Sequence, residues 1–182
     1  VLNNIGGAAS NFIAGADFVG DIYYGCVYGG TWVMMDPDDG IINVLGSCPD
    51  FAGVAYDLSS STMYGVTFAG ALYTVDYMTG VSTLVGNGAS GMIAMACSND
   101  GTLYDIDLNT DALGTIAKAT GAWTSLGPLG VDVNYAQDMA WDHADDVCYW
   151  AAYTLTYGIG QLYTIDHTTG AISLVGDFQG GE

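Results

Sequence analysis

Apolar and polar residues alternate in short segments along this chain, and the segments recur. Four stretches read as an apolar strand, a polar turn with Gly, and a second apolar strand that ends in Gly: TWVMMDPDDGIINVLG (31–46), ALYTVDYMTGVSTLVG (71–86), ALGTIAKATGAWTSLG (112–127) and QLYTIDHTTGAISLVG (161–176). Alternation with a period of two residues is typical of a half-buried β-strand. The chain shows no sustained period of 3.6 residues, so the pattern predicts strands rather than helices.

A second pair of strands precedes each of these hairpins. In the second repeat the four strands are expected at about 52–57, 62–69, 71–76 and 81–86. The first strands of the repeats end at positions 17, 57, 97 and 142, so the period is 40 to 45 residues. Such a period belongs to a four-stranded propeller blade rather than to a helical array. The sequence therefore predicts an all-β protein, a β-propeller of about four four-stranded antiparallel blades.

The repeats divide a single domain of 182 residues. Their boundaries are expected at about 7–46, 47–86, 87–127 and 128–176. Residues 1–6 resemble the last strand of a repeat, so the chain holds five strands of this outer type for four blades. Three explanations stay open: a larger propeller, addition of residues 1–6 to the edge of the last blade, or pairing with a neighbouring molecule. An unpaired strand edge is a template for such pairing.

The charge of the chain is strongly negative. It has 20 acidic residues and one basic residue, Lys118, which gives a formal net charge of −19. Nucleic acid is excluded as a partner, because phosphate contacts depend on Lys and Arg. No apolar run approaches the roughly 18 residues that a membrane helix needs, so membrane insertion is not expected. Association between copies would have to rely on apolar or backbone contacts, or on bound cations.

Four cysteines, Cys26, Cys48, Cys97 and Cys148, allow three disulfide connectivities. The blade alignment places Cys26 and Cys48 at one face of the disc, and Cys97 and Cys148 at the opposite face. We expect bridges 26–48 and 97–148, because bridged Cα atoms lie within about 7 Å of each other. Two disulfides would place the protein outside the reducing cytosol. Four buried free thiols are the alternative.

One acidic stretch has the composition of a calcium site. Asp105, Asp107, Asn109 and Asp111 carry oxygen ligands at alternate positions, which suits Ca²⁺. The stretch lacks the Gly at its sixth position and the acidic residue at its twelfth that an EF-type loop would have. A solvated acidic turn is the alternative interpretation, so calcium is a possible cofactor and no other cofactor is expected.

Two tryptophans depart from the repeat. Trp123 and Trp150 replace the smaller Ser82 and Gly65 of the second repeat. A residue that departs from the consensus of a repeat is a candidate for a special surface, here for stacking on a sugar, and core filling is the alternative. The only histidines, His143 and His167, fall in expected turns, and no Ser–His–Asp spacing is present. The chain is therefore predicted not to be an enzyme.

Several segments resemble the repeats of secreted bacterial β-propeller proteins. AGVAYDLSSSTMYGV (52–66), ALYTVDYMTGVSTLVG (71–86) and LYTIDHTTGAISLVG (162–176) carry the resemblance, which covers about residues 11–176. It implies a propeller fold and an extracellular or cell-surface location. It implies no activity, because such proteins share no common catalytic set and fold alone does not transfer function.

These patterns favour a non-enzymatic extracellular module of a structural or adhesive kind. It could assemble into a filament through residues 1–6, with copies of itself or other extracellular proteins as partners. A lectin-like propeller that binds a glycan or another ligand is the alternative. A hydrolase that uses a pair of the many Asp residues is a more distant one.

Overall fold

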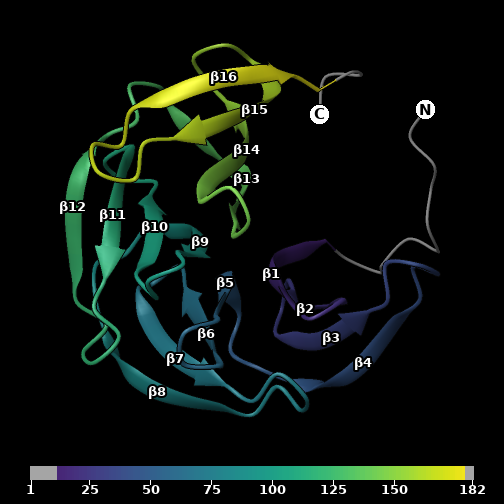
Figure 1. Ribbon diagram of the computed structural model, residues 1–182. Helices are drawn as coiled ribbons and strands as arrows, with labels where there is room; N and C mark the ends of the chain where they lie inside the picture. Colours follow the sequence, from purple (N-terminus) through teal and green to yellow (C-terminus); the bar gives the residue numbers. More distant parts are fainter. Residues whose placement is uncertain (1–11, 179–182) are drawn as a thin grey trace.

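The computed structural model describes residues 12–178, and these residues form sixteen strands in four antiparallel sheets (Figure 1). Blade 1 consists of β1 (Ile13–Val19), β2 (Ile22–Val27), β3 (Thr31–Met35) and β4 (Ile42–Ser47). Blade 2 consists of β5 (Phe51–Asp57), β6 (Thr62–Thr67), β7 (Ala71–Val75) and β8 (Ser82–Asn87).

The second half of the chain repeats this plan. Blade 3 consists of β9 (Met92–Cys97), β10 (Leu103–Asp107), β11 (Ala112–Ile116) and β12 (Trp123–Pro128). Blade 4 consists of β13 (Val133–Asp142), β14 (Val147–Thr154), β15 (Ile159–Ile165) and β16 (Ile172–Asp177). Each sheet pairs its strands in sequence order, and residues 12–178 contain no helix. The predicted all-β propeller of four four-stranded blades is confirmed.

The four blades are arranged around a common axis. The first strand of each blade, β1, β5, β9 or β13, lies innermost, and the fourth lies on the outer rim (Figure 1). Consecutive inner strands contact each other, β1 with β5, β5 with β9 and β9 with β13. Blades 1 and 4 flank the open side of the arc (Figure 1).

The turns between the third and fourth strands depend on glycine. Gly40, Gly80, Gly121 and Gly170 have φ angles of 66°, 78°, 74° and 80°, in the left-handed region where glycine is favoured. Each of their N–H groups donates to the carbonyl oxygen four residues earlier, as Gly80 does to Asp76 at 2.7 Å. The repeated Gly of the sequence is therefore a requirement of the local backbone.

Three apolar clusters, each between two consecutive blades, form the core. Tyr24 and Trp32 of blade 1 pack with Val54 and Met63 of blade 2. The next two clusters join blades 2 and 3, and blades 3 and 4, in the same way. Burial of such faces supplies most of the stability of the fold. The expected strand over residues 1–6 lies outside the described residues, and the filament prediction based on it remains a prediction.

Candidate functional site

The inner strands begin at one end of the disc, and a pocket of about 360 Å³ lies there. We call it the channel-mouth pocket. All four blades contribute to its lining, which consists of Phe12, Ala14, Tyr28, Asp50, Phe51, Ala52, Phe68, Ile93 and Tyr135. A pocket of this size, shared by several structural units and lined mostly by apolar and aromatic side chains, is typical of a ligand site.

Four aromatic side chains form the rim of the channel-mouth pocket. Phe12, Tyr28 and Tyr135 are 60%, 55% and 65% exposed, and Phe68 is 38% exposed. Phe12 stacks on Tyr28 with ring centroids 5.0 Å apart, and Phe68 lies 5.7 Å from Tyr135. Large aromatic side chains gathered in the open mark a surface that contacts another molecule, because burying them is favourable.

The local sequence explains how two of these rings are presented. Tyr28 and Phe68 begin the turns between the second and third strands of blades 1 and 2. Gly29, Gly30 and Gly70 follow them with φ angles of 95°, 86° and 85°. The Asp50 carboxylate accepts the N–H of Gly29 at 2.8 Å, which holds the first turn in place. Asp50 also adds a hydrogen-bond acceptor to an otherwise aromatic rim.

Sequence reasoning did not identify the channel-mouth pocket. Its exposed aromatic residues come from positions 12, 28, 68 and 135, and no local pattern connects them. The one available signal was an aromatic residue directly before a glycine-rich turn, as in Tyr28-Gly29-Gly30 and Phe68-Ala69-Gly70. A ring in such a turn is more exposed than one in a strand.

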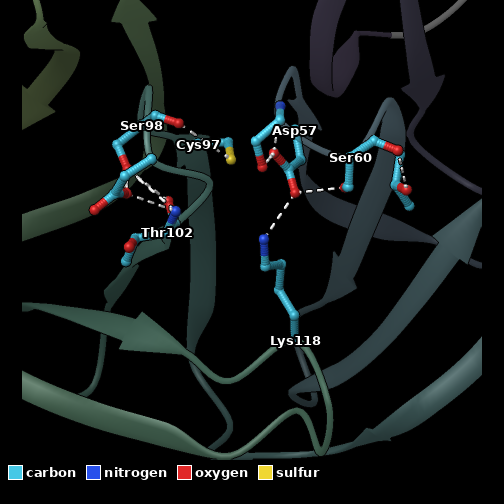
Figure 2. A network of polar contacts seen from close by, with 9 residues as sticks. Asp57, Ser60, Cys97, Ser98, Thr102 and Lys118 are labelled. Carbon is cyan, nitrogen blue, oxygen red and sulfur yellow. Dashed lines mark hydrogen bonds and ion pairs between the residues drawn. The ribbon is translucent and has the colours of Figure 1, made fainter.

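The opposite end of the disc carries a polar network that includes the chain's only basic residue (Figure 2). The Nζ of Lys118 in blade 3 lies 2.7 Å from the Oδ2 of Asp57 in blade 2, and the Asp57 side chain is fully buried. Burial opposes ionisation of Asp57, but hydrogen bonds from Lys118, Ser59 and Ser60 hold its pKa below the ordinary value. The ion pair therefore ties two blades together.

Cys97 lies beside this network (Figure 2). Burial raises the pKa of its thiol to about 12, and the negative charge of Asp57 adds to the effect. Only a thiolate reacts readily, so the raised pKa lowers the reactivity of this thiol at neutral pH. The contacts of this network join blades 2 and 3.

Two further carboxyl groups lie on inner strands at the two sides of the open arc. Burial raises the pKa of Asp138 on β13 to about 8, and the charge of Asp17 on β1 contributes. Burial also raises the pKa of Asp17, against hydrogen bonds from the N–H groups of Tyr56 and Phe18. Both groups therefore hold a proton more tightly than an exposed Asp would.

The position of Asp17 differs from the sequence alignment. The first hairpin of blade 1 turns over two residues between β1 and β2, whereas that of blade 2 uses four residues between β5 and β6. Asp17 pairs with Tyr24 and is thus equivalent to Ala55, which pairs with Tyr64. Asp57 lies in the expected turn instead, where its Oδ1 accepts the Ser59 N–H at 2.9 Å.

The predicted calcium ligands do not converge, so that prediction is corrected. Asp105 is fully buried in β10 and accepts the N–H groups of Ile93, Ala94 and Ile106. Asp107 accepts hydrogen bonds from its own turn. Asn109 donates to the carbonyl of Ser90, and Asp111 accepts the N–H of Val133.

These four side chains serve different stretches of backbone. Among residues 12–178, no group of three or more His, Cys, Asp or Glu side chains is placed to hold a metal ion. The Oδ2 of Asp105 has no hydrogen-bond partner in the same region, and burial holds the pKa of this carboxyl well above the ordinary value. A neutral acid is the form that such an environment favours.

The two tryptophans pack within the blades, which corrects their assignment as ligand-binding residues. Trp150 is fully buried between blades 3 and 4, and its Nε1 donates to the Oε1 of Gln137 at 2.8 Å. Trp123 is half-buried, and its ring fills the space that a side chain at Gly114 would occupy. Trp150 therefore has no exposed face for a sugar, and Trp123 packs on Gly114 of its own blade.

The cysteines are four free thiols in this structure, not two disulfides. The Sγ atoms of Cys26 and Cys48 are 3.4 Å apart, with Cys48 donating to Cys26, so this predicted pair is brought together. This hydrogen bond holds the pKa of Cys26 below its usual value and raises that of Cys48. Cys97 faces the core between blades 2 and 3, whereas Cys148 faces the core between blades 3 and 4. The predicted 97–148 pair is therefore separated by the sheet of blade 3.

Comparison with known proteins supports the fold more than a function. Residues 90–182 match the family described as "Domain of unknown function (DUF4394)". No curated protein matches the chain. The described part of the chain has no helix that could cross a membrane.

Three solved structures are similar to this one. A structural genomics protein of unknown function from Bacteroides thetaiotaomicron aligns with a TM-score of 0.68 and 16% identity, over 94% of this chain and 46% of its own. A nidogen/laminin complex aligns with a TM-score of 0.67 and 14% identity, over 93% of this chain and 66% of its own. An auxiliary nutrient binding protein from Bacteroides ovatus aligns with a TM-score of 0.59 and 16% identity, over 85% of this chain and 39% of its own.

These identities are low, so the likeness establishes the fold alone. The chain spans between 39% and 66% of the length of the matched proteins. The matched structures are propellers whose printed descriptions include unknown function, nutrient binding and a protein complex.

Proposed function

We propose that this chain, which belongs to the DUF4394 family of unknown function, is a non-enzymatic, extracellular binding module of an adhesive, lectin-like kind. The proposal rests on its channel-mouth pocket. The observation that carries the proposal is the group of exposed aromatic side chains around a pocket of about 360 Å³. The pocket has the volume expected for a small ligand, and it is formed in the structure as it stands.

A sugar is the ligand class that suits the rim best. The rings of Phe12, Tyr28, Phe68 and Tyr135 offer flat apolar faces to the C–H face of a pyranose. The Asp50 carboxylate and the Tyr135 hydroxyl can bond to its hydroxyl groups. The lining contains no basic side chain, so a phosphorylated or otherwise anionic ligand would find no partner there.

The channel carboxyl groups support binding rather than catalysis. Hydrolysis by a carboxylate pair needs one acid and one ionised base or nucleophile. Burial raises the pKa of both Asp138 and Asp17, so both carboxyl groups favour the protonated form more than an exposed Asp does. Neither residue lines the channel-mouth pocket. An extracellular location is supported by the resemblance of residues 52–66, 71–86 and 162–176 to secreted propeller repeats.

A glycan array with the intact chain tests the proposal, followed by calorimetric titration of the best ligand. Tyr135→Ala should weaken binding about tenfold, as expected for loss of an aromatic contact worth about 1.4 kcal/mol. Tyr157→Ala is the matched control, because Tyr157 is 59% exposed and lies outside the pocket. Binding of no glycan, or equal losses in the two variants, would overturn the proposal.

A further inference from the structure

The three interfaces between consecutive blades follow one plan. A tyrosine near the centre of the second strand packs against the blade that follows: Tyr24, Tyr64 and Tyr104 are 6%, 8% and 7% exposed. The residues of the inner strand on the same side are also covered, as with Ala55 (0%) and Ala96 (2%). We call this side of a blade its trailing face, and the side that meets the preceding blade its leading face.

Blade 4 has a trailing face of the same kind, and no blade formed by residues 12–178 covers it. Tyr149 pairs with Ala140 as Tyr64 pairs with Ala55 and Tyr104 with Ala96, so the positions are equivalent. Tyr149 is nevertheless only half-buried and Ala140 is exposed. A pocket of about 570 Å³ lies on this sheet, and its lining, which includes Ala136, Ala151 and Tyr153, comes from blade 4 and the adjoining Phe178.

Blade 1 shows the complementary feature on its leading face. Phe18 pairs with Tyr23 at the register position that Tyr56 and Trp141 occupy in blades 2 and 4. Tyr56 and Trp141 are 8% and 9% exposed, because the preceding blade covers them, whereas Phe18 is 47% exposed. The Phe18 and Tyr23 rings lie 5.2 Å apart and form an aromatic patch.

The chain thus carries both halves of an interface that it already builds three times. The two uncovered faces flank the open side of the arc (Figure 1). We propose that the trailing face of blade 4 in one copy packs against the leading face of blade 1 in a second copy, as consecutive blades do within the chain. The contact is head-to-tail, so it continues into a filament unless the rotation closes it into a ring.

The charge of the chain favours this kind of contact over others. At a net charge of −19, copies cannot be joined through complementary charges, because Lys118 is the only basic residue and is paired with Asp57. The faces concerned present mainly tyrosine, phenylalanine and alanine, whose burial does not require an opposite charge. The blade 4 face also contains one carboxyl group, Asp138, in the lining of its pocket.

The test is the mass of the intact chain in solution, by light scattering after size exclusion, over a range of concentrations. The proposal predicts particles at multiples of 18.9 kDa. Phe18→Glu and Ala140→Glu, one on each face, should each prevent assembly. Val81→Glu is the matched control, because Val81 is 66% exposed in a turn of blade 2.

Mixing the two variants provides a stricter test. Phe18→Glu keeps the trailing face of blade 4, and Ala140→Glu keeps the leading face of blade 1. An equimolar mixture should therefore form a dimer that grows no further, which also shows that both variants are folded. Deletion of residues 1–6 should leave assembly unchanged.

Three outcomes would overturn the proposal: a monomeric intact chain at every concentration, assembly of both variants as in the wild type, or loss of assembly only on deletion of residues 1–6. The second of these would leave the aromatic pocket and its sugar proposal untouched, because Phe18 and Ala140 lie outside that pocket.

Discussion

At the scale of single residues, the same side chain has opposite properties in different places. Asp57 is held ionised because a lysine and two serines donate to it. Asp138, whose described hydrogen bond is with the N–H of Met139, has a raised pKa because burial dominates. The cause in each case is the number of donors that reach the carboxyl group, set against the cost of removing it from water.

The Lys118–Asp57 pair makes a prediction about stability. Lys118→Met is expected to lower the free energy of unfolding by about 1–3 kcal/mol, because it leaves the buried Asp57 carboxylate without its cation. Urea denaturation at neutral pH measures the effect. The double variant Lys118→Met, Asp57→Asn should recover part of the loss, since no unpaired charge remains. A single variant within about 0.5 kcal/mol of the wild type would contradict the prediction.

Asp138 makes a prediction about pH. Its pKa is about 8 in the folded chain and about 3.9 when unfolded, so the folded state binds the proton more tightly. Its stabilising contribution is therefore complete below about pH 3.9 and is lost as the pH rises through about 8.

Asp138→Asn keeps the shape of the side chain and removes this titration. The stability of the wild type should fall relative to that of Asp138→Asn as the pH is raised from about 4 to about 8, measured by urea denaturation at each pH. The pKa of Asp57 is lowered, so its contribution to stability is lost as the pH falls at the acidic end. This contribution is the same in both proteins. Parallel stability curves for the two proteins would show that Asp138 does not titrate in this range.

At the scale of elements, turn length and strand register decide which side chains meet. The two-residue turn of the first hairpin places Asp17 opposite Tyr24, although the sequence spacing suggested the turn position of Asp57. The strand β2 and the connection after β4 bring Cys26 and Cys48 together. Which cysteines come close enough for a disulfide therefore depends on which elements are neighbours in the fold, and sequence spacing does not decide it.

The proximity of Cys26 and Cys48 predicts a single disulfide. Mild oxidation of the native protein should link these two residues and leave Cys97 and Cys148 as free thiols, since both are buried in separate cores. Closing this loop should stabilise the fold by about 3 kcal/mol. Non-reducing peptide mapping identifies the link, with Cys48→Ser as the control that should show none. A link from Cys26 to Cys97 would contradict the blade geometry.

At the scale of the whole molecule, charge and shape act together. The chain has 20 acidic residues, all but Glu182 within the described arc of four blades, so repulsion between them opposes the compact state. The fold compensates through apolar contacts between blades, which are insensitive to charge. The uncovered faces of blades 1 and 4 lack such an apolar contact with another described blade.

Salt should therefore raise the melting temperature. Increasing the ionic strength from about 0.01 M to about 0.15 M shortens the screening length from about 30 Å to about 8 Å and weakens the repulsion. Because Asp105, Asp107, Asn109 and Asp111 bond to separate stretches of backbone, Ca²⁺ and Mg²⁺ at equal ionic strength should have equal effects. A rise specific to Ca²⁺ in thermal denaturation would restore the calcium site that the geometry argues against.

The sequence by itself determined the class of fold, the four blades and the glycine turns. Each of these is a local property: alternation with a period of two residues, a repeat of 40 to 45 residues, and a positive φ at Gly80 and its equivalents. These patterns do not depend on how the blades pack, so the sequence alone was enough to predict them.

Only the tertiary structure decided which residues form a site. The channel-mouth pocket joins Tyr28, Phe68 and Tyr135 from three blades, and the same packing buries Trp150, which the sequence had offered as a ligand contact. It also separates Cys97 from Cys148 and disperses the predicted calcium ligands. Exposure and proximity are set by how blades pack on one another, and no short segment of the chain encodes that packing.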